Sequence, residues 1–151
     1  MRAQQGDGPA HPVVRPELVA MGWALAALTA VVVVLGTVVT GSGPHSGDAD
    51  SPARLGLDPR AMSWLHSDSV LVWFGLLLTL LVALRLTDGP RPARRAAVVT
   101  LGVGLAQGLI GYVQYATGLP VVAVALHMLG ACLLVVAVTR LLMTMRERLP
   151  A

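Results

Sequence analysis

The sequence predicts an all-α integral membrane protein that folds as a four-helix transmembrane bundle. The mean hydropathy of its 151 residues is +0.71, which is high for a globular domain. Only 13% of the residues are charged, whereas soluble domains carry roughly 25%. The apolar residues gather in four runs, each close to the ~20 residues that a helix needs to cross a bilayer. The excess of apolar residues therefore indicates membrane spans rather than a large globular core.

The four predicted spans cover about residues 18–40, 62–86, 96–115 and 121–143. Residues 1–17 are polar and contain several glycines and prolines, which predicts a cytoplasmic tail or a linker between domains. Residues 144–151 are expected to form a second cytoplasmic tail. Pro120 suits the start of the last helix, because a helix start does not use the N–H that proline lacks.

Arginine placement predicts the orientation of these spans. Most of the arginines flank one face of the predicted bundle, at positions 2, 15, 85, 91, 94, 95, 140, 146 and 148. Only Arg54 and Arg60 fall on the opposite side, among acidic residues. The positive-inside rule therefore predicts a multi-pass protein of the cell membrane with both termini in the cytoplasm. Because topology explains the arginines and the net charge of +3, no nucleic-acid partner is expected.

Several kinds of site are not indicated by the sequence. Cys132 is the single cysteine, so neither an intrachain disulfide nor a CxxC pair can form. No Ser-His-Asp order, zinc-ligand spacing or phosphate-binding loop is present, and no glutamate lies within a predicted span.

Two histidines, His66 and His127, lie inside apolar runs. An ionisable residue in a span is costly unless it faces the bundle interior and finds a partner. Both are expected near the outer membrane face, with His127 roughly 10 Å below the boundary at 1.5 Å per residue. Small residues share the helix face of His127 and leave room for a flat macrocycle: Ala123, Gly130 and Ala131. Since imidazole is a common axial ligand of haem, a haem iron held between the two histidines is the leading hypothesis; a helix–helix hydrogen bond is the alternative.

The third span carries a stripe of polar and small residues at steps of three and four: Thr100, Gly104, Gln107, Gly111, Gln114 and Gly118. Gln107 and Gln114 are candidates to contact a haem propionate or to orient an imidazole. Hydrogen bonds between helices are the favoured alternative for both. Arg54 and Arg60 are candidate partners for the propionates, with ordinary surface charge as the alternative. His45 is expected to be a solvated or loop-stabilising residue.

Four segments resemble the heme A synthase family, especially its actinobacterial members: GTVVTGSGPHSGD (36–48), LHSD (65–68), AQGLIGYVQYATGLP (106–120) and ALHMLGA (125–131). The resemblance runs from about residue 18 to residue 142 and corresponds to the C-terminal half of such an enzyme. It implies an eight-helix architecture built from two four-helix halves that are related by an internal repeat. It also implies that His66 and His127 are the axial ligands of the cofactor haem b.

The resemblance further implies an oxidoreductase that converts the methyl group of haem o to the formyl group of haem A for cytochrome oxidase assembly. The haem o/haem A substrate site would lie in a first half, where a glutamate and often a cysteine pair contribute. Those residues have no counterpart here, so residues 1–17 are interpreted as the linker from a missing first half. The expected partners are that half, membrane lipid and haem O synthase. Two alternatives remain: a stand-alone bis-histidine b-type membrane cytochrome for electron transfer, and a structural protein that binds no haem.

Overall fold

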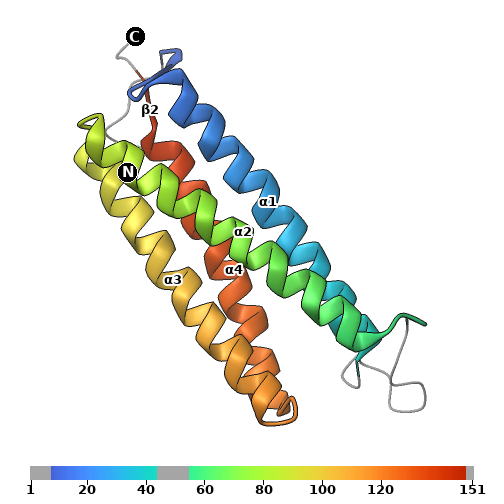
Figure 1. The fold of residues 1–151 in the computed structure, drawn as a ribbon. Coiled ribbons are helices and arrows are strands. Elements are labelled where there is room, and N and C mark those ends of the chain that lie inside the picture. The colour runs from blue at the N-terminus through green and yellow to red at the C-terminus, as the bar shows by residue number, and fades with distance from the viewer. Residues whose placement is uncertain (1–7, 44–54, 149–151) are drawn as a thin grey trace.

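The computed structural model describes residues 8–43 and 55–148, and its main feature is an antiparallel bundle of four long helices (Figure 1). The helices are α1 (Pro16–Ser42), α2 (Pro59–Leu86), α3 (Arg91–Ala116) and α4 (Val121–Thr144). All four are long and apolar enough to cross a membrane. The predicted all-α, four-helix fold is therefore confirmed; the eight-helix architecture is not tested by a single bundle.

Three helices begin before their predicted spans. α2 starts at Pro59 and α3 at Arg91, whereas the apolar runs suggested residues 62 and 96. Proline suits the first turn of a helix, and each of these helices has one at its first or second position. Asp58 also caps α2, since its side chain accepts a hydrogen bond of 3.0 Å from the Arg60 N–H. The helices thus extend beyond the apolar residues by turns that carry prolines and arginines.

A tight turn joins α3 to α4. Gly118 (φ +78°) and Leu119 (φ +60°) both adopt left-handed backbone conformations. Glycine reaches this region without steric cost, so Gly118 suits the position that follows the helix end. The short connection makes α3 and α4 adjacent and antiparallel.

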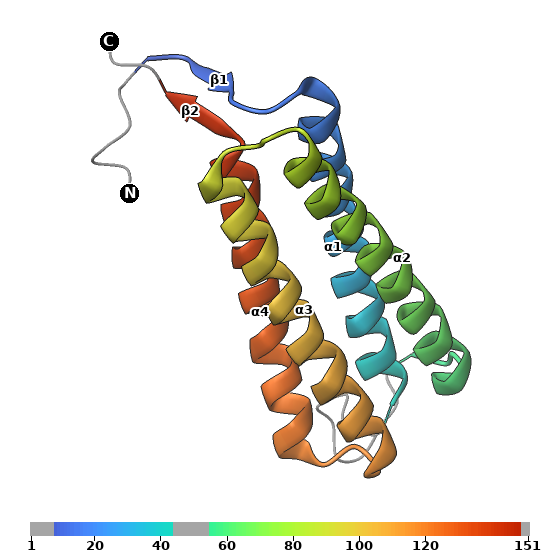
Figure 2. The ribbon, with the colours of Figure 1, turned by 60° about the vertical axis from the view of Figure 1, so that its left-hand side comes forward.

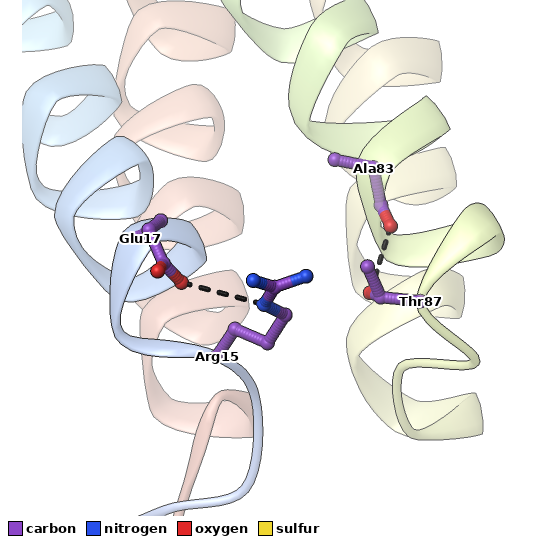
Figure 3. A network of polar contacts seen from close by, with 4 residues as sticks. All are labelled: Arg15, Glu17, Ala83 and Thr87. Atoms are coloured by element: carbon purple, nitrogen blue, oxygen red, sulfur yellow. Dashed lines mark hydrogen bonds and ion pairs between the residues drawn. The ribbon is translucent and has the colours of Figure 1, made fainter.

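The two described chain ends lie together at one end of the bundle (Figure 2). There β1 (Ala10–Pro12) pairs antiparallel with β2 (Arg146–Arg148), a contact that the sequence did not predict. The exposed ion pair between Arg15 and Glu17 (3.5 Å) lies close by, near the end of α2 where Thr87 bonds back to the Ala83 carbonyl (Figure 3). Such an exposed pair contributes little to stability.

These features distinguish the two ends of the bundle. We call the end with the described chain termini and the α2–α3 connection the arginine end, since it carries Arg85, Arg91, Arg94 and Arg95. The opposite end, with the start of α2 and the α3–α4 turn, is the histidine end. An even number of helices places both described chain ends at the same end of the bundle, which agrees with the prediction that both termini lie on one side of the membrane. Which end faces the cytoplasm stays a prediction.

The hydrophobic core occupies the half of the bundle nearer the arginine end. Its largest fully buried side chains include Leu25, Leu77, Leu80 and Leu141. Among the described residues, no hydrophobic side chain is buried beyond Val32 in α1, Trp73 in α2 or Leu134 in α4 toward the histidine end. In α3 the last buried residue in that direction is Gln107. Burial of hydrophobic side chains therefore ends before the level of the two histidines, although the polar Ser42 at the end of α1 is buried.

The two helical hairpins, α1–α2 and α3–α4, repeat one pattern of burial. In both α1 and α3, the third, seventh, tenth, fourteenth and seventeenth residues are buried. In α2, and in α4 together with Met145 at its C-cap, buried residues follow the histidine by seven, eleven, fourteen and eighteen positions. The two hairpins therefore present equivalent faces to the common core, and they place His66 and His127 at equivalent positions.

Candidate functional site

The candidate site is formed by two histidines at equivalent places in the two hairpins. His66 is the eighth residue of α2, and His127 is the seventh residue of α4. Both side chains are half-buried, and both lie in the part of the helices nearer the histidine end. The structure thus brings the two predicted ligands to the same region of the histidine end.

Each imidazole lies against a glycine of the neighbouring helix in its own hairpin. A Cβ atom at Gly36 of α1 would lie 3.3 Å from Cε1 of His66, and one at Gly111 of α3 would lie 3.2 Å from Cε1 of His127. Both glycines are the twenty-first residue of their helix. Any larger residue would press on the ring, so glycine at these two places lets each imidazole lie close to the adjacent backbone.

The hydrogen bonding of His66 leaves one ring nitrogen available. Its Nδ1 lies 3.1 Å from the backbone carbonyl oxygen of Val32. Because a carbonyl can only accept, Nδ1 carries the proton and donates it, which leaves the lone pair of Nε2 free. No bond to Nε2 is found in the described part of the chain. A backbone carbonyl on the second nitrogen is the usual way in which proteins orient a metal-binding histidine.

Gln107 occupies in α3 the place that Val32 occupies in α1. Unlike Nδ1 of His66, which lies against the Val32 carbonyl, Nδ1 of His127 is buried and lacks a hydrogen bond in the structure. The side-chain amide of Gln107 crosses to α4 and donates to the backbone carbonyl of His127 (2.8 Å). It lies directly over Gly130, where a Cβ atom would overlap with Oε1 of Gln107. Gln107 therefore makes the helix-to-helix hydrogen bond that was the favoured alternative for it.

Three buried polar atoms near the histidines lack a hydrogen-bond partner among the described residues: Nδ1 of His127, Oε1 of Gln107 and Oε1 of Gln114. Buried polar groups in native proteins are nearly always paired, so each exception calls for a physical reason. All three lie beyond the packed core on α3 and α4. This part of the bundle therefore offers polar atoms that a ligand or water can satisfy.

Trp73 forms the floor of this region, two turns from His66 along α2. It is almost fully buried, and its indole N–H donates to the Thr29 hydroxyl of α1 (2.8 Å). Its ring reaches across to α3, where a Cβ atom at Gly104 would lie 2.8 Å away. Trp73 thus ties α1, α2 and α3 together and separates the packed core from the histidines.

The residues present fit a haem better than a metal held by protein ligands alone. In the described part of the chain, no group of three or more His, Cys, Asp or Glu residues gathers to hold a metal ion. A haem needs only axial ligands from the protein, because the porphyrin supplies the other four. Two half-buried imidazoles in the part of the bundle without buried hydrophobic side chains match that requirement, and Nδ1 of His127 is itself one of the unpaired polar atoms.

No described contact joins the other predicted site residues to the two histidines. Arg60 is exposed in the first turn of α2, where only its backbone N–H makes a described contact. Gln114 is half-buried on α3 with its unpaired Oε1. Arg54 and His45 lie outside the described residues, so their predicted roles stay predictions. The sequence analysis did not single out Gly36, Val32 or Trp73. Gly36 could have been found from its correspondence with Gly111, since both are the twenty-first residue of their helix.

No family model, curated protein or solved structure matches this chain. The comparisons therefore assign it to no family. The fold and the site define its class: an all-α bundle with four helices able to cross a membrane and a pair of equivalent histidines in its loosely packed half.

Proposed function

We propose that the chain binds a b-type haem with His66 and His127 as axial ligands, and that it forms the haem b-binding half of a heme A synthase. The observation that carries the haem site is the abrupt end of the hydrophobic core at the level of the two histidines. Equivalent helix positions direct both imidazoles to one region, and two glycines let the rings lie close to the helices. The family assignment rests on the four resembling sequence segments.

In this proposal, the haem iron supplies one-electron redox chemistry. The protein residues hold and orient it. Val32 fixes the protonated nitrogen of His66 and leaves Nε2 available, while Gln107 holds the backbone of His127 against α3. Trp73 closes the site toward the packed core. Oxidation of the haem o methyl group would take place in the partner half, to which this half supplies electron transfer.

The decisive experiment expresses the chain in membranes, purifies it in mild detergent and records reduced-minus-oxidised spectra. The wild type is expected to show a low-spin b-type spectrum. His66→Ala and His127→Ala are each expected to abolish it, because a bis-histidine site fails when either axial ligand is lost. His11→Ala is the matched control, since His11 lies exposed in β1 at the other end of the bundle. Full haem occupancy in either ligand variant would refute the site.

A stand-alone b-type cytochrome is the second candidate function, and one observation favours it: both proposed ligands, His66 and His127, belong to this single chain. The two functions separate when haem is extracted from membranes that also contain a heme A synthase first half and a source of haem o. Formation of haem A that depends on His66 and His127 supports the synthase. A stable b-type spectrum without haem A supports the cytochrome.

A further inference from the structure

A shallow groove of about 380 Å³ lies at the arginine end, on the opposite end of the bundle from the histidines. Its lining comes from two helices: Arg85 near the end of α2, and Arg94, Arg95, Val98 and Val99 near the start of α3. Three arginines therefore line one hollow together with two apolar side chains.

The charges in this groove are unfavourably placed with respect to the helix dipole. The first five residues of α3 include three arginines, and its first turn contains no acidic residue. The start of a helix carries partial positive charge, so cations there are repelled by the dipole as well as by one another. An anion bound at this place would relieve both repulsions.

No carboxylate of the described residues relieves them. Within residues 8–43 and 55–148, none of the three groove arginines forms an ion pair with a described carboxylate. The nearest acidic residue in sequence, Asp88, is exposed in the α2–α3 connection and makes no ion pair with them. Within residues 8–43 and 55–148, the groove thus presents arginines that no described carboxylate neutralises.

The two valines give the groove an apolar wall on the side nearer the middle of α3. Val98 and Val99 follow Arg94 and Arg95 by one helical turn and are 46% and 59% exposed. Topology explains why arginines gather at this end, but it requires neither that they line one groove nor that exposed valines continue it. Phosphate next to apolar chains is the chemistry of a phospholipid.

We propose that this groove binds one anionic phospholipid, with the three arginines on its headgroup and the two valines against its acyl chains. Basic pockets between helices at a membrane boundary suit such headgroups, and guanidinium is well matched to phosphate. The inference rests on the bundle spanning a membrane and is independent of the haem site.

The test is a native mass spectrometry titration of the full chain in detergent, with phosphatidylglycerol and phosphatidylcholine of identical acyl chains. The wild type is expected to retain phosphatidylglycerol preferentially. R94Q/R95Q should weaken its binding at least about fivefold, and R85Q about fivefold, which is the usual effect of removing a basic residue near an anionic lipid. Equal retention of both lipids by the wild type would overturn the proposal.

The matched control is R91Q, because Arg91 lies in the same helical turn but does not line the groove. Its lipid binding should stay within about twofold of the wild type; a loss as large as that of R94Q/R95Q would show a general charge effect and contradict the site. Inorganic phosphate at equal concentration should not displace the lipid, and if it does, the groove is a phosphate site instead. Circular dichroism checks that each variant keeps its helices. If R94Q/R95Q does not fold, R85Q on α2 still tests the groove.

Discussion

The imidazole of His127 lies against Gly111 on the adjacent helix, and a Cβ atom at that glycine would approach Cε1 of the ring to 3.2 Å. His66 has the same relationship with Gly36 in the other hairpin. Each candidate ligand therefore lies against a residue that has no side chain, Gly36 for His66 and Gly111 for His127. The first prediction tests whether this close approach positions the ligand.

Gly111→Ala should displace the His127 ring by a few tenths of an ångström. Because groups that orient a metal-binding histidine typically contribute 10- to 100-fold to affinity, haem binding is expected to weaken by about tenfold. Titration of the apoprotein with haem, followed by its Soret absorbance, measures the change. Unaltered affinity and spectrum would show that the glycine does not position the ligand.

Gly108→Ala is the matched control for this substitution. Gly108 lies one turn earlier in α3, and a Cβ atom there meets nothing within 4 Å. Its haem affinity should equal that of the wild type, and replacing glycine inside a helix should stabilise the fold by about 0.5–1 kcal/mol. The pair of variants thus separates contact with the ring from the general effect of alanine in α3.

Removal of the haem supplies a second prediction. The half of the bundle near the histidines lacks a packed core, so a ligand that fills it should stabilise the fold. Mass action gives about 2.7 kcal/mol at a free haem concentration 100 times Kd. Thermal unfolding followed by circular dichroism, with and without haem, measures the difference.

The same comparison in the His127→Ala variant is the control for haem-linked stability. That variant should unfold at nearly the same temperature with and without haem, because haem would have lost one axial ligand. Equal stabilisation of the variant and the wild type would indicate that haem acts through non-specific hydrophobic binding.

Sequence patterns predicted the helices because each apolar run is long enough to leave only one solution in a bilayer. They also indicated His66 and His127, since an imidazole in such a run needs a reason to be there. The interhelical hydrogen bond of Gln107 was foreseen as an alternative, because a polar stripe at helical spacing faces a neighbouring helix.

Other features were beyond the reach of those patterns. Gly36 stands in a run of β-branched residues, so its partnership with His66 depends on the pairing of α1 with α2 rather than on a local motif. The pairing of β1 with β2 joins residues from opposite ends of the chain over only three positions each. Helix starts at Pro59 and Arg91 were missed because they lie outside the apolar runs that defined the spans.

Thr29→Val gives a third prediction, which concerns the floor of the site. The substitution keeps the shape of the side chain but leaves the buried Trp73 indole N–H without its acceptor. Interhelical hydrogen bonds in membrane proteins average about 0.6 kcal/mol and reach about 1.7, so a destabilisation in this range is expected. Titration of the bundle with a denaturing detergent measures it.

Thr79→Val is the control for the loss of the hydroxyl itself. Thr29 and Thr79 both donate to the carbonyl four residues earlier, but Thr79 is exposed on α2 and no described hydrogen bond joins it to another helix. Its substitution should change the free energy of unfolding by less than about 0.5 kcal/mol. Equal effects of the two variants would show that the bond to Trp73 adds nothing.

The contact between Gln107 and Gly130 supplies the last prediction, which is a double-mutant cycle. In Gly130→Ala, the new methyl group would overlap with the Gln107 amide and expel it from the His127 carbonyl, so a destabilisation of about 1–3 kcal/mol is expected. In the Gln107→Ala background, the same change meets no amide and should have little effect. The two substitutions should therefore be coupled by at least about 0.5 kcal/mol in the free energy of unfolding, as is usual for residues in direct contact. Additive effects would mean that the amide already lies elsewhere and does not hold His127 against α3.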